Sequence, residues 1–147
     1  MAEVGTGAEQ RLRITRTLAA SRERILRAWT EAEAMKRWYA PGETKVAIAE
    51  VDLRVGGAWR VLMRATDGSE YDIRGVYREI EPPSRLVFTW KWVHEPAEKE
   101  TLVTVELRDV AGRTELVLTH ERFKEDQDRS NHETGWHACL DNLEKTV

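Results

Sequence analysis

His120 is the residue of this sequence best placed to do chemistry in an apolar setting. It follows Leu116 and Leu118 at alternate positions, so the three side chains point to one face of a predicted strand. A histidine titrates near neutrality and can donate or accept a hydrogen bond. His120 would therefore orient a ligand carbonyl or phenol, or remove a proton from an acidic C–H as a general base. The alternative is a buried histidine that is hydrogen-bonded to His132, to a tyrosine or to the backbone.

His132 and Cys139 are of types found in metal sites and nucleophilic catalysis. His132 and His137 are separated by about 140° around a helix, so they do not face one metal ion together. Two imidazoles without a third ligand do not make a zinc centre. The nearest base to Cys139 is His132, about 10 Å along the helix, which favours a structural thiol. Because Gly56-Gly57 also lacks the strand-to-helix context of a phosphate loop, the sequence predicts no metal, no cofactor and no covalent nucleophile.

Six tryptophans in 147 residues are the second chemical signal. Each combines a large apolar area with one N–H donor, so several around a pocket favour a flat, ring-containing or acyl ligand with few polar groups. The alternative is that these rings fill a core. The residues predicted to line a cavity are Trp38, Tyr71, Tyr77, Phe88, Trp90, Trp92, His120, His132, Trp136, Cys139 and Leu140.

Short alternating segments separated by turn residues position these side chains. Gly56-Gly57, Asp67-Gly68, Pro82-Pro83 and Ala111-Gly112 each separate two such segments, and close turns join antiparallel strands. No helix between them supports a parallel crossover. Together with the alternating segment at the start, the pattern predicts seven strands, at 11–18, 44–54, 58–66, 69–80, 85–94, 100–110 and 113–120.

Two short helices are expected between the first two strands. Ser21 has the character of an N-cap for the first helix, and Thr30 with Glu33 has the spacing of a capping box for the second. Ala40-Pro41-Gly42 ends the second helix. The apolar residues are Ile25, Leu26 and Trp29 in the first helix, and Met35 and Trp38, expected to form an adaptable lid, in the second.

A longer helix is expected at the C-terminal end, at about 130–147. At 100° per residue, its apolar residues fall within a stripe about 100° wide, so this face is predicted to cover the sheet. Gly135 is expected to let the helix approach the sheet closely. The residues of the stripe are His132, Trp136, Cys139, Leu140, Leu143 and Val147.

Length, charge and cysteine content bound the class of protein. A chain of 147 residues and 17.0 kDa predicts one domain at 11–147 after a flexible start at 1–10, with about 69% of the unfolded surface buried. A net charge of −3 provides no excess of positive charge with which to bind nucleic acid. No run is long enough to span a membrane. One cysteine, which cannot form an internal disulfide, and no basic-then-apolar leader predict a cytoplasmic location.

Five blocks of the chain also carry a resemblance to a known family: VDLRVGGAWRVLM (51–63), GVYREIEPPSRLVFTW (75–90), ETLVTVEL (100–107), LVLTHERF (116–123) and HETGWHACLDNL (132–143). These blocks resemble single-domain proteins related to the C-terminal domain of the activator of Hsp90 ATPase. That family lies in the helix-grip superfamily, with START lipid-binding domains, polyketide cyclases and the birch-pollen allergen fold. The resemblance spans about 11–145 and implies an α+β helix-grip fold, a curved seven-stranded antiparallel sheet whose long C-terminal helix covers a deep apolar cavity.

Three functions are consistent with these features. The first is a cytoplasmic protein that binds a small hydrophobic ligand, aromatic, acyl or polyketide-like, since no catalytic set is assembled. The second is an enzyme of the cyclase or dehydratase type, with His120 as base and Tyr71 or Tyr77 as donor to an enolate. The third is a protein-interaction module like the activator of Hsp90 ATPase. It would use the convex face of the sheet or the 94–99 loop. A homodimer through the edge strand 11–18 would be a related contact.

Overall fold

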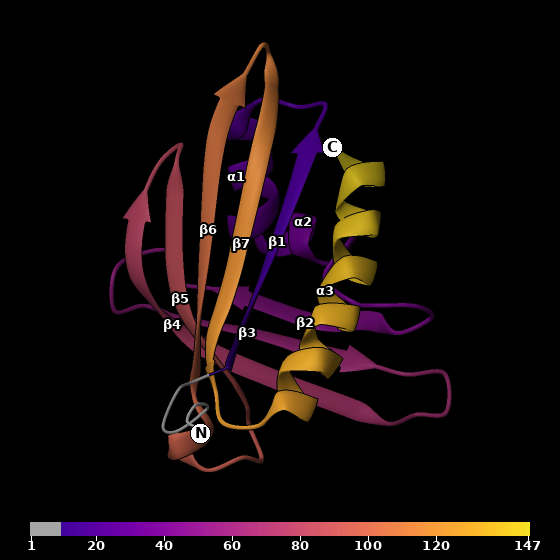
Figure 1. Cartoon of the computed structure of the whole chain (residues 1–147). Coiled ribbons are helices and arrows are strands. Elements are labelled where there is room, and N and C mark those ends of the chain that lie inside the picture. Colours follow the sequence, from indigo (N-terminus) through magenta and orange to yellow (C-terminus); the bar gives the residue numbers. More distant parts are fainter. Residues whose placement is uncertain (1–9) are drawn as a thin grey trace.

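The computed structural model describes residues 10–147, which form a strongly curved sheet and three helices around one hydrophobic core (Figure 1). The predicted flexible start at 1–10 lies outside the described residues, apart from Gln10, which begins β1. In Figure 1, β2 and β3 run almost across the direction of β6 and β7, so the sheet wraps around the core instead of lying flat.

All seven predicted strands are present in one antiparallel sheet, with the order β1-β7-β6-β5-β4-β3-β2. The α+β helix-grip prediction is therefore confirmed. The boundaries differ from the predicted ones by up to three residues. The strands are β1 (Gln10–Leu18), β2 (Lys45–Val51), β3 (Ala58–Arg64), β4 (Glu70–Glu81), β5 (Arg85–Trp92), β6 (Thr101–Val110) and β7 (Arg113–Phe123).

Two short helices, α1 (Arg22–Thr30) and α2 (Ala32–Met35), follow β1. Ser21 caps α1 as predicted, because its hydroxyl accepts a hydrogen bond from the Arg24 N–H at 3.2 Å. The capping box at Thr30 was a wrong prediction: the Thr30 hydroxyl instead donates to the Leu26 carbonyl at 2.8 Å. A short 3-10 helix, η1 (Ala97–Lys99), lies between β5 and β6.

The C-terminal helix, α3 (Asp126–Thr146), begins four residues before the predicted start at 130. Its first turn is entirely polar and its N-cap residue makes no side-chain cap bond, so neither an apolar stripe nor a cap marks this turn in the sequence. The predicted stripe does face the sheet. Its buried members are Trp136, Cys139, Leu140 and Leu143.

Arg16 fixes α3 to the edge of the sheet. Its side chain lies on the inner face of β1, in line with Ile14 and Leu18, and it reaches the helix that lies beside β1 in Figure 1. The guanidinium contacts the Asp141 carboxylate at 2.9 Å and donates to the His137 carbonyl at 3.3 Å. These partners belong to the second half of α3, so that half is held to the sheet by charge as well as by burial.

Gly75 of β4 leaves room for the Trp59 side chain of β3 to lie across β4 and reach β5. The Trp59 side chain lies against Gly75, and its indole N–H donates to the Thr89 carbonyl of β5 at 3.1 Å. A Cβ atom at Gly75 would overlap both that carbonyl and the indole ring. A side chain at position 75 is therefore incompatible with this arrangement of three strands.

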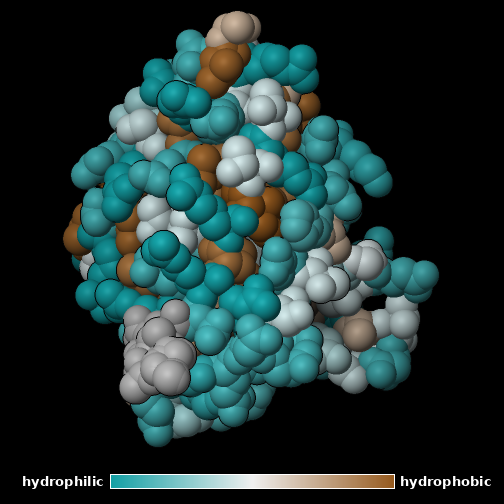
Figure 2. Space-filling view, in the orientation of Figure 1, coloured by the Kyte–Doolittle hydropathy of each residue, from teal (hydrophilic) through white to brown (hydrophobic). Residues whose placement is uncertain are grey.

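Several arginines on the outer face of the sheet are paired with acidic residues on neighbouring strands. Arg60 makes two 3.1 Å hydrogen bonds to Asp72, and these bonds lower the pKa of that carboxyl. Arg85 contacts Glu106 at 2.8 Å. Figure 2 shows this face as mainly hydrophilic, with some hydrophobic residues visible over β6 and β7. Opposite charges on adjacent strands thus complete the solvent side of the sheet.

Candidate ligand pocket

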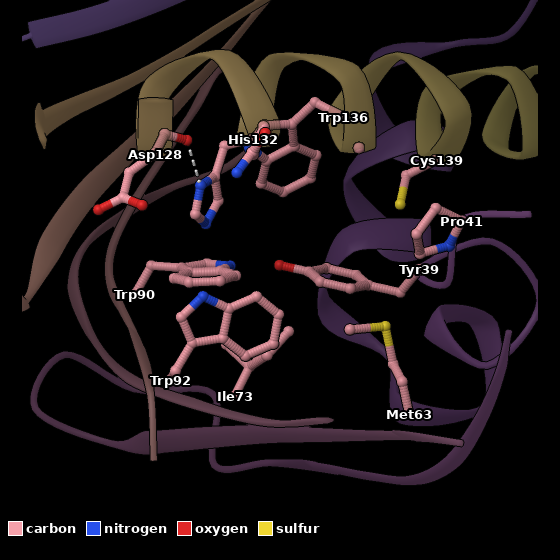
Figure 3. A pocket seen from close by; sticks show the side chains of 12 residues that line it. Tyr39, Pro41, Met63, Ile73, Trp90, Trp92, Asp128, His132, Trp136 and Cys139 are labelled. Carbon is pink, nitrogen blue, oxygen red and sulfur yellow. Dashed lines mark hydrogen bonds between the residues drawn. The ribbon is translucent and has the colours of Figure 1, made fainter. Parts of the chain in front are cut away.

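A pocket of about 290 Å³ lies between α3, the inner faces of β3, β4 and β5, and the segment after α2 (Figure 3). Its volume is at the lower end of the range for small-molecule sites. Most of its walls are aromatic or aliphatic. The lining residues are Tyr39, Pro41, Met63, Ile73, Trp90, Trp92, Asp128, Asn131, His132, Gly135, Trp136 and Cys139.

Five of the eleven residues predicted from the sequence line this pocket, and the other six do not. The five come from β5 and α3, where the alternation of the strand and the apolar stripe of the helix face each other. They are Trp90, Trp92, His132, Trp136 and Cys139.

The remaining predicted residues fill the core or lie at its edge. Tyr71 is 43% exposed at the end of β4, whereas Tyr77 is buried with Phe88 nearer to α2. Leu140 is fully buried in the core. Trp38 is also buried and donates its indole N–H to the Ala28 carbonyl at 2.8 Å, so it is part of the helix packing and not a lid.

The lining residues that the sequence interpretation missed come from the segment after α2, from β3 and β4, and from α3. They are Tyr39, Pro41, Met63, Ile73, Asp128, Asn131 and Gly135. Tyr39 follows the predicted Trp38 and takes the place by the pocket that Trp38 was expected to have. Met63 and Ile73 are at inward positions of their strands. Ile73 lies between Tyr71 and Tyr77 on the same face of β4. The alternation that led to the prediction of the two tyrosines could therefore also have identified Ile73.

His120 is fully buried, and both of its ring nitrogens have partners inside the protein. The Trp136 indole N–H donates to His120 Nδ1 at 3.0 Å, so Nδ1 is the unprotonated nitrogen. His120 Nε2 then donates to the Thr101 hydroxyl at 2.7 Å, and that hydroxyl donates to the Trp90 carbonyl at 2.9 Å. The chain of bonds joins α3 to β5, β6 and β7. It leaves His120 no free nitrogen for a ligand, and His120 is absent from the pocket wall.

His132 packs against His120, with ring centroids 5.2 Å apart, and forms part of the pocket wall. Its Nδ1 lies 2.8 Å from the Asp128 carbonyl. A carbonyl only accepts, so Nδ1 carries the proton and Nε2 presents a lone pair in the neutral ring. An irregularity at Arg122, whose φ is +76°, lets both His120 and Phe123 of β7 point toward this ring.

The fully buried His120 and the half-buried His132 both have pKa values below the ordinary value. Burial is the main cause for each, and the neighbouring His132 lowers the pKa of His120 further. For His132, the bond to the Asp128 carbonyl and the charges of Asp128 and Glu95 oppose the shift without cancelling it. Both rings are therefore neutral at pH 7.

The free energy of unfolding is expected to fall as the pH is lowered from 7 to 5. In the unfolded chain these histidines bind protons near pH 6.5, whereas the folded protein resists protonation, so acid favours unfolding by up to about 1.4 kcal/mol per pH unit for each histidine. Urea titrations across this range measure the slope. His132→Gln should reduce it, and the control His94→Gln, at an exposed residue, should not. An unchanged slope in His132→Gln would contradict this account.

The Tyr39 hydroxyl and the Cys139 thiol of the pocket are held in their neutral forms. Burial raises the pKa of the Cys139 thiol to about 12. Burial also raises the pKa of Tyr39 well above its ordinary value, with smaller contributions from Cys139 and Tyr77, while the facing Trp90 N–H lowers it. A thiolate nucleophile is therefore disfavoured at Cys139.

Gly135 is the position where the helix leaves the pocket open. The expectation that it brings α3 close to the sheet was wrong, because a Cβ atom at Gly135 would have no neighbour within 4 Å. The residue instead lines the pocket. The missing side chain thus contributes space and not close packing.

Gly135→Ala is expected to raise the free energy of unfolding by about 1 kcal/mol, because alanine is the better helix former and its methyl group meets no other atom. Thermal or urea unfolding monitored by circular dichroism measures the change. A decrease in stability would show that α3 needs the glycine for a close contact after all.

Two alternatives to this pocket, a metal site and a hollow on the outer face, find no support within residues 10–147. No group of three histidine, cysteine, aspartate or glutamate side chains in this range is placed to hold a metal ion. A hollow of about 500 Å³ on the outer face is lined largely by charged residues. Among them, Arg85 pairs with Glu106 and Arg108 pairs with Glu115, so its charges are already compensated.

A curved antiparallel sheet that holds a long C-terminal helix across an apolar pocket defines a helix-grip protein. Within that class, the chain belongs to the family of the Activator of Hsp90 ATPase homolog 1-like protein, whose model matches residues 19–147. The family prediction from the five sequence blocks is therefore confirmed. No helix within the described part of the chain has the length and apolar character needed to cross a membrane.

Solved structures of bacterial proteins share this fold over nearly the whole chain. A protein from Chromobacterium violaceum is 26% identical, with 94% of this chain and 97% of that chain covered and a TM-score of 0.85. A putative uncharacterized protein from Rhizobium leguminosarum is 30% identical over 92% of both chains, with a TM-score of 0.77. The AHSA1 protein from Silicibacter pomeroyi, 24% identical over 92% of this chain and 96% of that chain, has a TM-score of 0.81. No curated protein matches the sequence.

Proposed function

We propose that the protein binds a small hydrophobic ligand, aromatic or acyl in character, in the pocket between the sheet and α3. The observation that carries the proposal is the pocket itself, about 290 Å³ of space with three tryptophans, a tyrosine, a methionine and an isoleucine in its walls. Unfilled apolar space in a core costs stability, and an apolar ligand removes that cost. The family is compatible with such a role.

Binding is favoured over catalysis by the state of the polar groups. The base expected for a cyclase, His120, has both ring nitrogens engaged, and burial holds it neutral. The tyrosines expected to donate to an enolate, Tyr71 and Tyr77, do not line the pocket. Burial also keeps the Tyr39 hydroxyl and the Cys139 thiol of the pocket wall in their neutral forms, so an enzymatic role has less support than a binding role.

A thermal-shift screen tests the proposal directly. Fatty acyl, steroid, flavonoid and polyketide-like compounds are added at about a hundred times the dissociation constant, where binding to the folded state adds about 2.7 kcal/mol. For a domain of this size the melting temperature should rise by about 5–11 °C. No shift with any of these four classes would overturn the proposal.

A protein partner is the second candidate, and membership of the chaperone-activator family is the observation that favours it. The contact would use the outer sheet face or the 94–99 loop. Lys91 of β5 holds the start of that loop by donating to the Trp92 and Glu95 carbonyls, at 2.8 Å and 2.6 Å. Capture of a chaperone that persists when the pocket is blocked would favour this function.

We further propose that residues 11–147 act as one domain and that the protein works in the cytoplasm. All three helices and the sheet contribute to a single hydrophobic cluster, which supports one folding unit. The single cysteine is free and buried, which fits a reducing compartment. Urea unfolding followed by fluorescence and by circular dichroism should give one coincident transition if this unit is single.

A further inference from the structure

Three polar atoms that line the pocket are buried without a hydrogen-bond partner among residues 10–147. They are the Tyr39 hydroxyl, Trp90 Nε1 and His132 Nε2. Tyr39 and Trp90 are 4% and 6% exposed, so water does not reach them freely. A buried polar atom without a partner is costly, and three of them in one pocket indicate a missing polar group.

These three atoms come together around the Trp90 indole. In Figure 3 the Tyr39 hydroxyl and the free ring nitrogen of His132 both point toward it. The rings of Trp90 and His132 are perpendicular, with centroids 4.7 Å apart. The opposite end of the pocket, where Met63, Pro41 and Cys139 lie, is apolar (Figure 3). The pocket therefore has one polar end and one apolar end.

The hydrogen-bond roles of the polar end can be assigned. Trp90 Nε1 only donates, and the Tyr39 hydroxyl either donates or accepts. His132 Nε2 accepts, because its Nδ1 proton is committed to the Asp128 carbonyl. One oxygen atom that accepts from both Trp90 Nε1 and the Tyr39 hydroxyl and donates to His132 Nε2 satisfies the set. Among the oxygen groups of a ligand, a hydroxyl meets this requirement, whereas an ether, a ketone or a carboxylate has no proton to donate.

The charges around the pocket also select against an anion. Among residues 10–147, Asp128 is the only charged residue in the lining, and it lies near Lys99, whose ammonium is 3.8 Å from its carboxylate. No lysine or arginine in the described part of the chain lines the pocket to balance a buried carboxylate or phosphate. Burying an unpaired charge is very costly, so a neutral ligand is favoured.

We propose, on the basis of the ligand-binding function above, that the pocket is specific for neutral aromatic compounds bearing a hydroxyl group, such as phenols and naphthols, with that hydroxyl bound among Tyr39, Trp90 and His132. The tryptophan and tyrosine rings provide faces for the aromatic part of the ligand. The hydroxyl then completes the hydrogen bonds that the protein leaves open.

Calorimetric titration with four compounds of one shape tests this specificity. The probes are 2-naphthol, naphthalene, 2-methoxynaphthalene and 2-naphthoate at pH 7.5. The affinity for 2-naphthol should exceed that for each of the others by about tenfold or more, because only the hydroxyl both donates and accepts. Tyr39→Phe and His132→Phe should each reduce this preference several-fold, while the control Tyr77→Phe, a buried tyrosine outside the pocket wall, should keep it.

The outcomes separate this inference from the binding function on which it rests. Equal affinity for all four compounds, or tighter binding of 2-naphthoate, would overturn the hydroxyl specificity while the pocket still binds ligands. Binding of none of the four would count against both. Tyr39→Phe removes an unpartnered buried hydroxyl, and His132→Phe removes the unpartnered Nε2 together with one bond to the Asp128 carbonyl within α3. Both variants are expected to fold. Circular dichroism checks this, and the comparison of probes on the unmodified protein needs no variant.

Discussion

Gly75→Ala is expected to destabilise the protein by about 3 kcal/mol or more, a large part of the stability of a typical domain. The added methyl group would overlap the Thr89 carbonyl and the Trp59 indole, and both are held by the hydrogen bond between them. Relief requires β3 and β5 to move apart around β4, with loss of ladder hydrogen bonds. Urea unfolding measures the change, and the melting temperature should fall by about 6–12 °C.

Gly135→Ala is the matched control, because it makes the same chemical change where no atom lies within 4 Å. The two variants should therefore change stability in opposite directions. If Gly75→Ala were within about 1 kcal/mol of the unmodified protein, the packing of Trp59 across Gly75 would not be the constraint described here.

Gly135→Phe is expected to weaken ligand binding by about 100-fold or more, which corresponds to about 2.7 kcal/mol. A long helical side chain extends toward the preceding turn of its helix, which here carries Asn131 and His132 of the pocket wall. The phenyl ring would occupy the space of a ligand. Calorimetric titration with 2-naphthol, or with the best compound of the thermal-shift screen, measures the loss.

Ser130→Phe provides the control for this blocking variant. Ser130 is exposed on the same helix and does not line the pocket, so its replacement tests the effect of an added phenyl ring on α3 itself. Binding should remain within about twofold of that of the unmodified protein. Full binding by Gly135→Phe would show that the ligand occupies another part of the molecule.

The architecture was predictable from the sequence because the alternation of the strands is regular and their turns are short. The same alternation is not enough to locate a site. Tyr71 and Tyr77 share a face of β4, yet six residues of strand span about 20 Å, more than one small pocket covers. Their places in the structure, at the exposed edge and near α2, follow from where α3 crosses the sheet. The residue pattern of a single strand does not indicate where α3 will cross the sheet.

The pocket residues after α2 were missed for a different physical reason. Trp38 and Tyr39 are neighbours with similar side chains, and their directions depend on the turn that follows Met35. In the structure Trp38 bonds to the Ala28 carbonyl, which leaves Tyr39 to face α3. Likewise, His120 was recognised as inward-facing, but its partners Trp136 and Thr101 come from other elements. Only the assembled fold shows that its hydrogen bonds are already made.

The position of the single cysteine makes the pocket accessible to chemical labelling without any engineered residue. Cys139 is the one thiol of the chain and it forms part of the pocket wall. Since its thiolate is scarce at neutral pH, a thiol-reactive dye will modify the folded protein only when the space around the sulfur opens to solvent. The labelling rate therefore reports how often the pocket opens, and a bound ligand should lower the labelling rate.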